Sequence, residues 1–150
     1  MLVGTWIAFP FAFFAGALVT VQAGSNAQLK QSFGSAMPAL LVNYVLGFTM
    51  VLGYALMARV PWPTMDRIGA APWWAWIGGL SGAAYGVAAI LLASQLGAAT
   101  LMALAVSGQL LISVAFDHFS LLGFEAHPAG WARLAGCILM VCGFVLIAKF

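Results

Sequence analysis

The chain has 150 residues, of which 65% are hydrophobic and 5% are charged, and its formal net charge is +2. Soluble domains carry about a quarter of charged residues, so this composition excludes an ordinary water-soluble fold and is typical of a protein surrounded by lipid. Five Lys and Arg residues are too few for a nucleic-acid-binding surface. We therefore expect a single transmembrane domain over residues 1–150, in contact with the lipid bilayer and not with nucleic acid.

Five apolar segments are long enough to cross a bilayer, because a transmembrane helix needs about 20 mainly apolar residues. In chain order they are residues 4–23, 36–58, 73–93, 98–116 and 131–148. Their apolar runs are unbroken rather than alternating, which favours helices over the strands of a membrane barrel. The sequence thus predicts an all-α polytopic membrane protein with about five transmembrane helices.

An odd number of crossings places the two chain ends on opposite sides of the membrane. On the side of the N-terminus, here called face A, lie Arg59, Arg67 and Arg133, whereas Lys30 and Lys149 lie on the other side, face B. This near-balance sets no clear orientation under the positive-inside rule. Two interpretations stay open: a fixed topology set by other signals, or an inverted pair formed with a second copy or a homologous subunit. The inverted pair would generate the inverted repeat on which many transporters are built.

Glycines four residues apart mark a packing surface on the third predicted helix. The stretch "GGLSGAAYG" contains Gly78, Gly82 and Gly86. Lipid gives helices no hydrophobic reason to associate, so close backbone approach at small residues supplies the contact energy. The contact is expected either within the protomer or at a subunit interface.

Uncharged polar side chains are distributed through the predicted depth of the membrane. Gln22 and Asn26 are expected near face B, Asn43 about 10 Å and Gln109 about 16 Å into their helices, and Ser113 one turn beyond Gln109. They are candidates for hydrogen-bonding groups that line a substrate path. The alternative is that each amide is an interhelical hydrogen-bonding residue that only holds the helices together.

Charged residues gather in the connection before the last helix. Asp117 continues the four-residue spacing of Gln109 and Ser113, and with Arg133 on the same side it forms either a gate or an ordinary interfacial ion pair. His118, Glu125 and His127 follow, but their spacing matches no metal-ligand pattern. No catalytic triad, phosphate loop or cofactor motif is recognisable. We expect no metal, no cofactor and no enzyme activity.

Four segments carry a resemblance to a known family. They are "QAGSNAQLKQSFGS", "PWWAWIGGLSGAAYGVAAILLASQLGAATLMAL", "SGQLLISVAFDHFSLLGF" and "RLAGCILMVCGFVLI". Their most specific pieces are the pair Gln22 and Asn26, the pair Gly78 and Gly79, the run Gly108, Gln109, Ser113 and Asp117, and Arg133 with Gly136. In these the chain resembles the YdcZ-like branch of the drug/metabolite transporter superfamily. Ser120 departs from the pattern, which has glycine there.

The resemblance implies a small-molecule transporter of the bacterial inner membrane that works by alternating access. Larger members of the superfamily are ten-helix inverted repeats, so this chain corresponds to half of one. The smallest multidrug relatives carry a glutamate in the first helix, whereas this chain has Gln22 and no carboxylate there. A neutral or zwitterionic substrate is therefore expected rather than a cationic drug exchanged for protons. The competing interpretations are a structural or assembly subunit of a larger membrane complex, which transports nothing, and a channel.

Overall fold

The computed structural model describes the backbone of residues 2–150 and the side chains from residue 6 onward. Five long helices dominate it: α1 (Leu2–Phe33), α2 (Ala36–Met57), α4 (Ile77–Leu96), α5 (Ala98–Phe119) and α6 (Trp131–Lys149). The connections contain a short helix, α3 (Met65–Gly69), and two 3-10 turns, η1 (Trp73–Trp76) and η2 (Leu121–Gly123). All five long helices are apolar and long enough to cross a membrane, which confirms the predicted all-α polytopic architecture.

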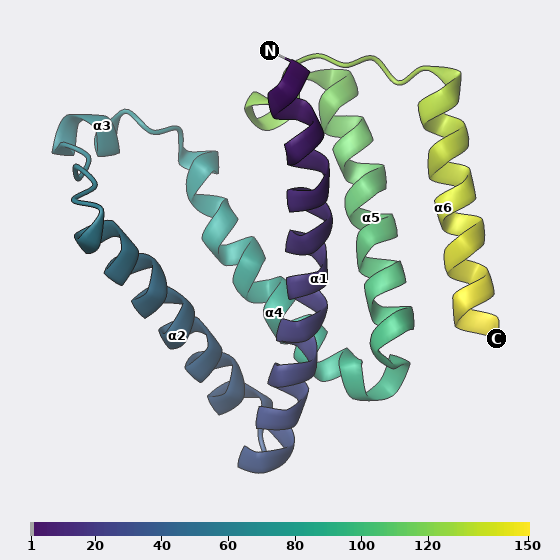
Figure 1. Ribbon diagram of the computed structural model, residues 1–150, viewed down its shortest axis with the longest axis horizontal. Coiled ribbons are helices and arrows are strands. Elements are labelled where there is room, and N and C mark those ends of the chain that lie inside the picture. Colours follow the sequence, from purple (N-terminus) through teal and green to yellow (C-terminus); the bar gives the residue numbers. More distant parts are fainter. Residues whose placement is uncertain (1) are drawn as a thin grey trace.

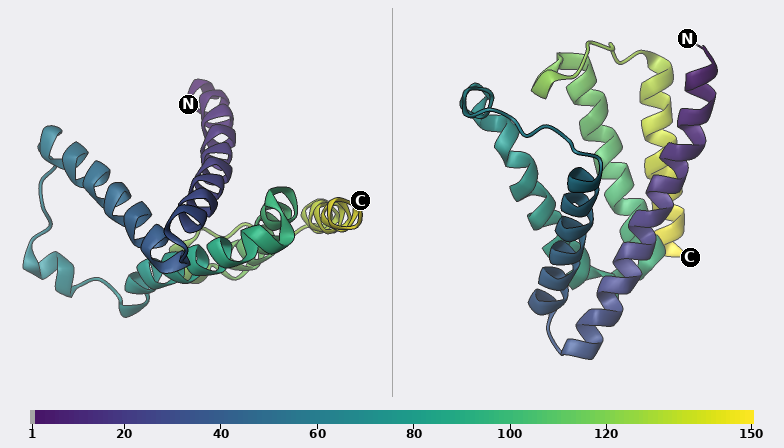
Figure 2. Two further views of the ribbon diagram at one scale, coloured as in Figure 1. Left: turned by 90° about the horizontal axis from the view of Figure 1, so that it is seen from below. Right: turned by 60° about the vertical axis from the view of Figure 1, so that its left-hand side comes forward.

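The helices run alternately up and down, so the connections separate onto two ends (Figure 1). The N-terminus, α3 and the η2 connection lie at the upper end, which is face A. The α1–α2 and α4–α5 turns and the C-terminus lie toward the lower end, which is face B. α1 packs against α2, α4 and α5, while α6 lies at the edge of the molecule beside α5. Seen along the helices, they form an open fan rather than a closed bundle (Figure 2).

The first helix continues well past its predicted end at residue 23. α1 reaches Phe33, which adds ten residues (33 minus 23). The added segment contains no proline, and its residues 27–31 are Ala, Gln, Leu, Lys and Gln, all good helix formers, so its polarity does not end the helix. At 1.5 Å per residue, Gln22 and Asn26 lie about 16 Å and 10 Å from the end of α1. They are thus further from the face B end of the helix than the predicted span implied.

Two turns have backbone conformations that favour glycine. Gly97 is the single residue between α4 and α5, and its φ of 77° with ψ of 160° is a combination open almost only to glycine. It lets the two helices reverse direction at once and form an antiparallel pair. Ser120 ends α5 with φ of 51° and ψ of 41°, which is the left-handed region. The position where the family pattern expects glycine is therefore one where a side chain is strained.

Little of the surface is buried within the chain. Its accessible area is 11551 Å² for a mass of 15.7 kDa, whereas a compact soluble protein of that mass exposes about 7,300 Å². A small core forms where Ala36 and Ala39 of α2 meet Ile90 of α4, with Leu29 of α1 packed against it. The bilayer, or the bilayer together with another subunit, must cover the remaining apolar side chains.

The charge distribution over the two ends leads to a prediction about orientation. Adding Ser35→Lys and Gln95→Lys, both exposed near the face B turns, reverses the count of three Arg against two Lys. Basic residues are retained in the cytoplasm, so a reporter fused after Phe150 should become almost wholly cytoplasmic. Thr64→Lys with Ala126→Lys, the matched pair on face A, should drive the same reporter to the other side. A reporter that responds to neither pair would show that this charge balance does not set the topology.

Candidate substrate-binding site

Three amide side chains converge on a cavity of about 160 Å³ between α1, α2 and α4. Gln22 and Asn26 come from α1 and Asn43 from α2, and we call the cavity the amide pocket. Gln22 Nε2 donates a hydrogen bond to Asn43 Oδ1 at 3.3 Å. The rest of the wall comes from Val19, Ala23, Leu40, Tyr44, Gly82, Tyr85, Gly86 and Ala89. The structure thus brings together three of the five residues that the sequence marked as substrate-binding.

Asn26 is the unusual member of the pocket. Only 8% of the residue is exposed, and it lines the cavity. Within the described part of the chain its side chain makes no hydrogen bond, whereas Gln22 and Asn43 are paired with each other. Among the described residues, the buried side-chain polar atom that lacks a partner is Ser107 Oγ, so the amide atoms of Asn26 are reached from the cavity and are not sealed off. The unused donors and acceptor of Asn26 are therefore available to water or to a polar solute in the pocket.

A close helix contact closes one side of the pocket. The Tyr44 hydroxyl donates to the Gly82 carbonyl oxygen at 2.9 Å and lies directly against Gly86. A Cβ at Gly86 would collide with that hydroxyl and sit 3.0 Å from Leu40 Cδ1, whereas a Cβ at Gly78 or Gly82 would meet nothing within 4 Å. The predicted glycine ridge is therefore divided: Gly86 packs within the protomer, and the other two positions stay open.

Gln109 lies in a neighbouring cavity and not in the amide pocket. This second cavity has a volume of about 600 Å³, lies between α1 and α5, and includes Tyr85 of α4 and Met140 of α6. Val19 and Tyr85 line both cavities, so the two spaces adjoin at these side chains. Gln109 and the three pocket amides thus occupy adjacent cavities.

Ser113, Asp117 and Arg133 line a third space, a groove of about 620 Å³ between α5 and α6. The sequence placed Gln109, Ser113 and Asp117 on one helix face because they are four residues apart. Each such step turns the side chain by about 40°, since four residues exceed the 3.6 of one turn. Over two steps the rotation reaches about 80°, and Asp117 therefore faces α6 while Gln109 faces α1. Met140 borders both spaces.

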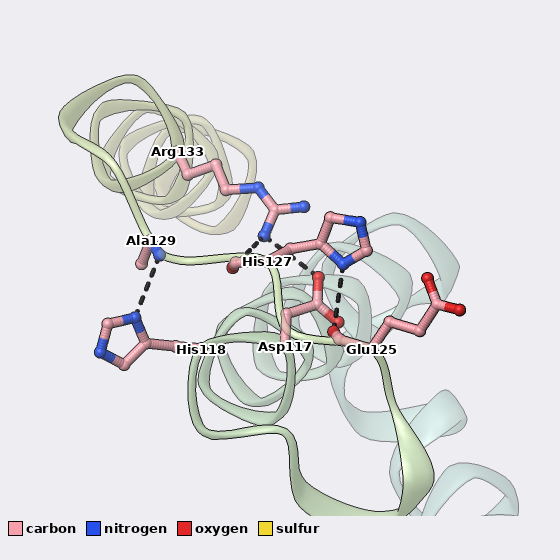
Figure 3. Close-up of polar contacts among 6 residues, drawn as sticks. All are labelled: Asp117, His118, Glu125, His127, Ala129 and Arg133. Carbon is pink, nitrogen blue, oxygen red and sulfur yellow. Dashed lines mark hydrogen bonds and ion pairs between the residues drawn. The ribbon is translucent and has the colours of Figure 1, made fainter.

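The charged connection before α6 is held by a network of hydrogen bonds (Figure 3). Arg133 Nη1 lies 3.1 Å from Asp117 Oδ2 and 3.0 Å from the His127 carbonyl oxygen. The His127 backbone N–H donates to the Asp117 carbonyl at 2.9 Å, and the Ala129 N–H donates to His118 Nδ1 at 3.1 Å. The predicted pairing of Asp117 with Arg133 is therefore present. Among the described residues, no three His, Cys, Asp or Glu side chains gather as metal ligands.

Two tyrosines and one lysine escaped the sequence reasoning. Tyr44 and Tyr85 line the amide pocket, although in the sequence they read as ordinary aromatic residues of apolar helices. The sequence signal for the two tyrosines is their position next to residues already singled out, since Tyr44 follows Asn43 and Tyr85 precedes Gly86. For Lys30, the sequence indicates only a positive charge on face B. Lys30 lies one turn beyond Asn26 on the extended α1, and its ammonium contacts α4.

The five apolar helices define the class of the protein as a multi-pass, α-helical membrane protein. Comparison with known proteins gives the family: residues 7–146 match the family model described as "Putative inner membrane exporter, YdcZ", and the chain belongs to that family. It is 27% identical over 139 residues to "Inner membrane protein YdcZ" of Escherichia coli (strain K12), covering 93% of each chain. No solved structure matches it. The protein is thus a multi-pass inner membrane protein of a transporter family, not of an enzyme family.

The ion pair at face A leads to a prediction about stability. The Arg133 and Asp117 side chains are 42% and 25% exposed, and solvent weakens such pairs. A double-mutant cycle of Asp117→Asn and Arg133→Gln should give a coupling free energy below about 1 kcal/mol. Arg133→Gln alone should lower the melting temperature more than Asp117→Asn, because it also removes the bond to the His127 carbonyl. A coupling well above that value would mean that the pair is shielded from water, as in a closed gate.

Proposed function

We propose that the protein transports a small neutral or zwitterionic polar solute, which binds in the amide pocket. The observation that carries the proposal is Asn26, a residue only 8% exposed whose amide lines the cavity and makes no hydrogen bond within the described chain. Gln22 and Asn43 are bonded to each other, so the pocket retains both donors and acceptors for a solute. An amide that served only to hold helices together would instead be paired across them.

The charges of the chain support an uncharged or zwitterionic solute over a cation. Its three acidic side chains are Asp66, Asp117 and Glu125, which all lie in or beside the face A connections. None lines the amide pocket. A transporter that exchanges a cation for protons needs a carboxylate at the binding site, and Gln22 cannot exchange a proton in that way.

Alternating access in an inverted pair accounts for the open shape of the protomer. The helices form a fan, and the chain exposes 11551 Å². Gly78, where a Cβ would meet nothing within 4 Å, leaves room for a partner helix on α4. The amide pocket lies nearer to face B, so an inverted copy places its own pocket nearer to the opposite side. Fixing every copy in one orientation, as two added lysines should do, would then abolish transport.

The three adjoining spaces define a route through the protomer. Tyr85 and Val19 separate the amide pocket from the cavity of Gln109, and Met140 separates that cavity from the groove of Ser113 and Asp117. A solute released from the amide pocket would pass Tyr85 and Gln109. The Asp117–Arg133 pair would then act as the gate at face A.

The pocket leads to a prediction about transport. In proteoliposomes supplied with a labelled metabolite mixture, Asn26→Leu should abolish uptake while the melting temperature stays constant or rises, because no protein hydrogen bond is lost. Gln28→Leu is the matched control, since Gln28 is exposed on the same helix and lines none of the cavities described above; it should transport normally. Gln109→Leu should also reduce uptake if its cavity belongs to the route.

The same measurements separate the competing functions. Saturable exchange is the expected behaviour of a carrier, flux that rises linearly with concentration would indicate a channel, and no flux with any substrate would favour a non-transporting subunit. A folded Asn26→Leu protein that transports normally would contradict the assignment of the site.

A further inference from the structure

Lys30 lies one helical turn beyond Asn26, in the last turn of α1. Gln22, Asn26 and Lys30 are spaced four residues apart on α1, and the side chains of successive members lie about 5–6 Å from one another at Cβ. The residue is half-buried, and its Nζ donates to the Ile90 carbonyl oxygen at 3.3 Å and to Ser94 Oγ at 3.2 Å. Both acceptors belong to α4, next to the Ala89 wall of the amide pocket. The ammonium is therefore held on α4 at residues one and five positions beyond Ala89, and Lys30 does not itself line the pocket.

The Lys30 ammonium has no anionic side chain as a partner. All three side-chain carboxylates belong to the face A connections, and the ion pair found in the described chain joins Asp117 to Arg133. The positive charge of Lys30 is stabilised by a neutral carbonyl oxygen, by a hydroxyl and by the C-terminal end of α4. The dipole of that helix end is equivalent to about half a negative charge. Lys30 lies in the last turn of α1, where its long stem lets the ammonium reach the membrane surface, so a cation without a protein carboxylate is tolerated there. The chain thus has a cation beside a polar pocket and supplies no carboxylate for it.

We propose that Lys30 and Asn26 together bind a carboxylate group of the transported molecule. This inference rests on the proposed function and narrows its substrates to small carboxylates and to zwitterions such as amino acids. Lysine has a flexible four-carbon stem, so the ammonium can turn from α4 toward Asn26 one helical turn away. Its hydrogen bonds to a carboxylate would be shorter and stronger than those it makes to the neutral groups of α4. The Gln22 and Asn43 amides then bind the remainder of the molecule.

Transport of matched probe pairs tests this assignment. Proteoliposomes are supplied with labelled glycine, serine and glycerate, each compared with its primary amide, which lacks the carboxylate. The wild-type protein should prefer at least one acid over its amide. Lys30→Gln should reduce uptake of that acid at least tenfold and change uptake of the amide less than twofold, whereas Lys30→Arg should keep the preference. Lys149→Gln is the control, because it removes the other lysine of the chain and that residue is exposed at the end of α6.

Chemical modification of the wild-type protein tests the binding step without relying on transport or on a variant that folds. A water-soluble anionic acetylating reagent is applied, and Lys30 and Lys149 are quantified separately by mass spectrometry. The three acids should slow acetylation of Lys30 at least threefold relative to Lys149, and their amides should not. Protection without transport would support the Lys30 site and contradict the proposed function. The Lys30 assignment would be overturned if the wild-type protein took up acid and amide equally, or if the Lys30→Gln protein kept the preference for the acid. It would also be overturned if the acids neither protected Lys30 from acetylation nor were preferred in transport.

Discussion

A polar side chain inside a membrane protein must find its hydrogen bonds within the protein, with water or with a ligand, and the arrangement of this chain depends on that constraint. The central element is the long helix α1. Because it continues to Phe33, it carries Gln22, Asn26 and Lys30 along the face that meets α2 and α4. Gln22 pairs with Asn43, Lys30 bonds to α4, and Asn26 faces the cavity. Had α1 ended at residue 23, Asn26 and Lys30 would lie in a loop without a defined partner.

Weak packing is the second feature that shapes the protein. Lipid is as apolar as the side chains it surrounds, so helices associate where small residues allow close approach or where polar groups bond. The contact of Tyr44 with Gly82 and Gly86 has both properties, and it joins α2 to α4 at the wall of the amide pocket. Elsewhere the helices diverge, and α6 lies at the edge beside α5 (Figures 1 and 2). A protomer of this shape offers surfaces to a second subunit without rearrangement of its core.

The fold was predictable from the sequence because hydrophobic length alone marks a membrane helix, and family membership followed from the same segments. The end of α1 was not, since residues 24–33 are polar enough to resemble a loop although the run 27–31 has high helix propensity. The pairing of Asp117 with Arg133 could be anticipated, as both lie beside one connection. The separation of Gln109 from Asp117 could not, because four-residue spacing indicates a shared face only until the rotation of the helix accumulates. The tyrosines that line the pocket are marked in the sequence only by their neighbours Asn43 and Gly86, which is a weak signal among so many apolar and aromatic residues.

The central claim, that the amide pocket is a water-filled binding site open to the aqueous phases, is tested most directly by cysteine labelling. Cys137 and Cys142 are first replaced by alanine, and a single cysteine is then placed at Ala89, which lines the pocket, or at its neighbour Ala88, which is exposed and does not. Consecutive residues of a helix point about 100° apart, so the second position faces lipid. A membrane-impermeant maleimide should label the Ala89→Cys protein in sealed vesicles and leave Ala88→Cys unmodified. Equal labelling of both, or an Ala89→Cys protein that reacts from neither side of the membrane, would contradict the account.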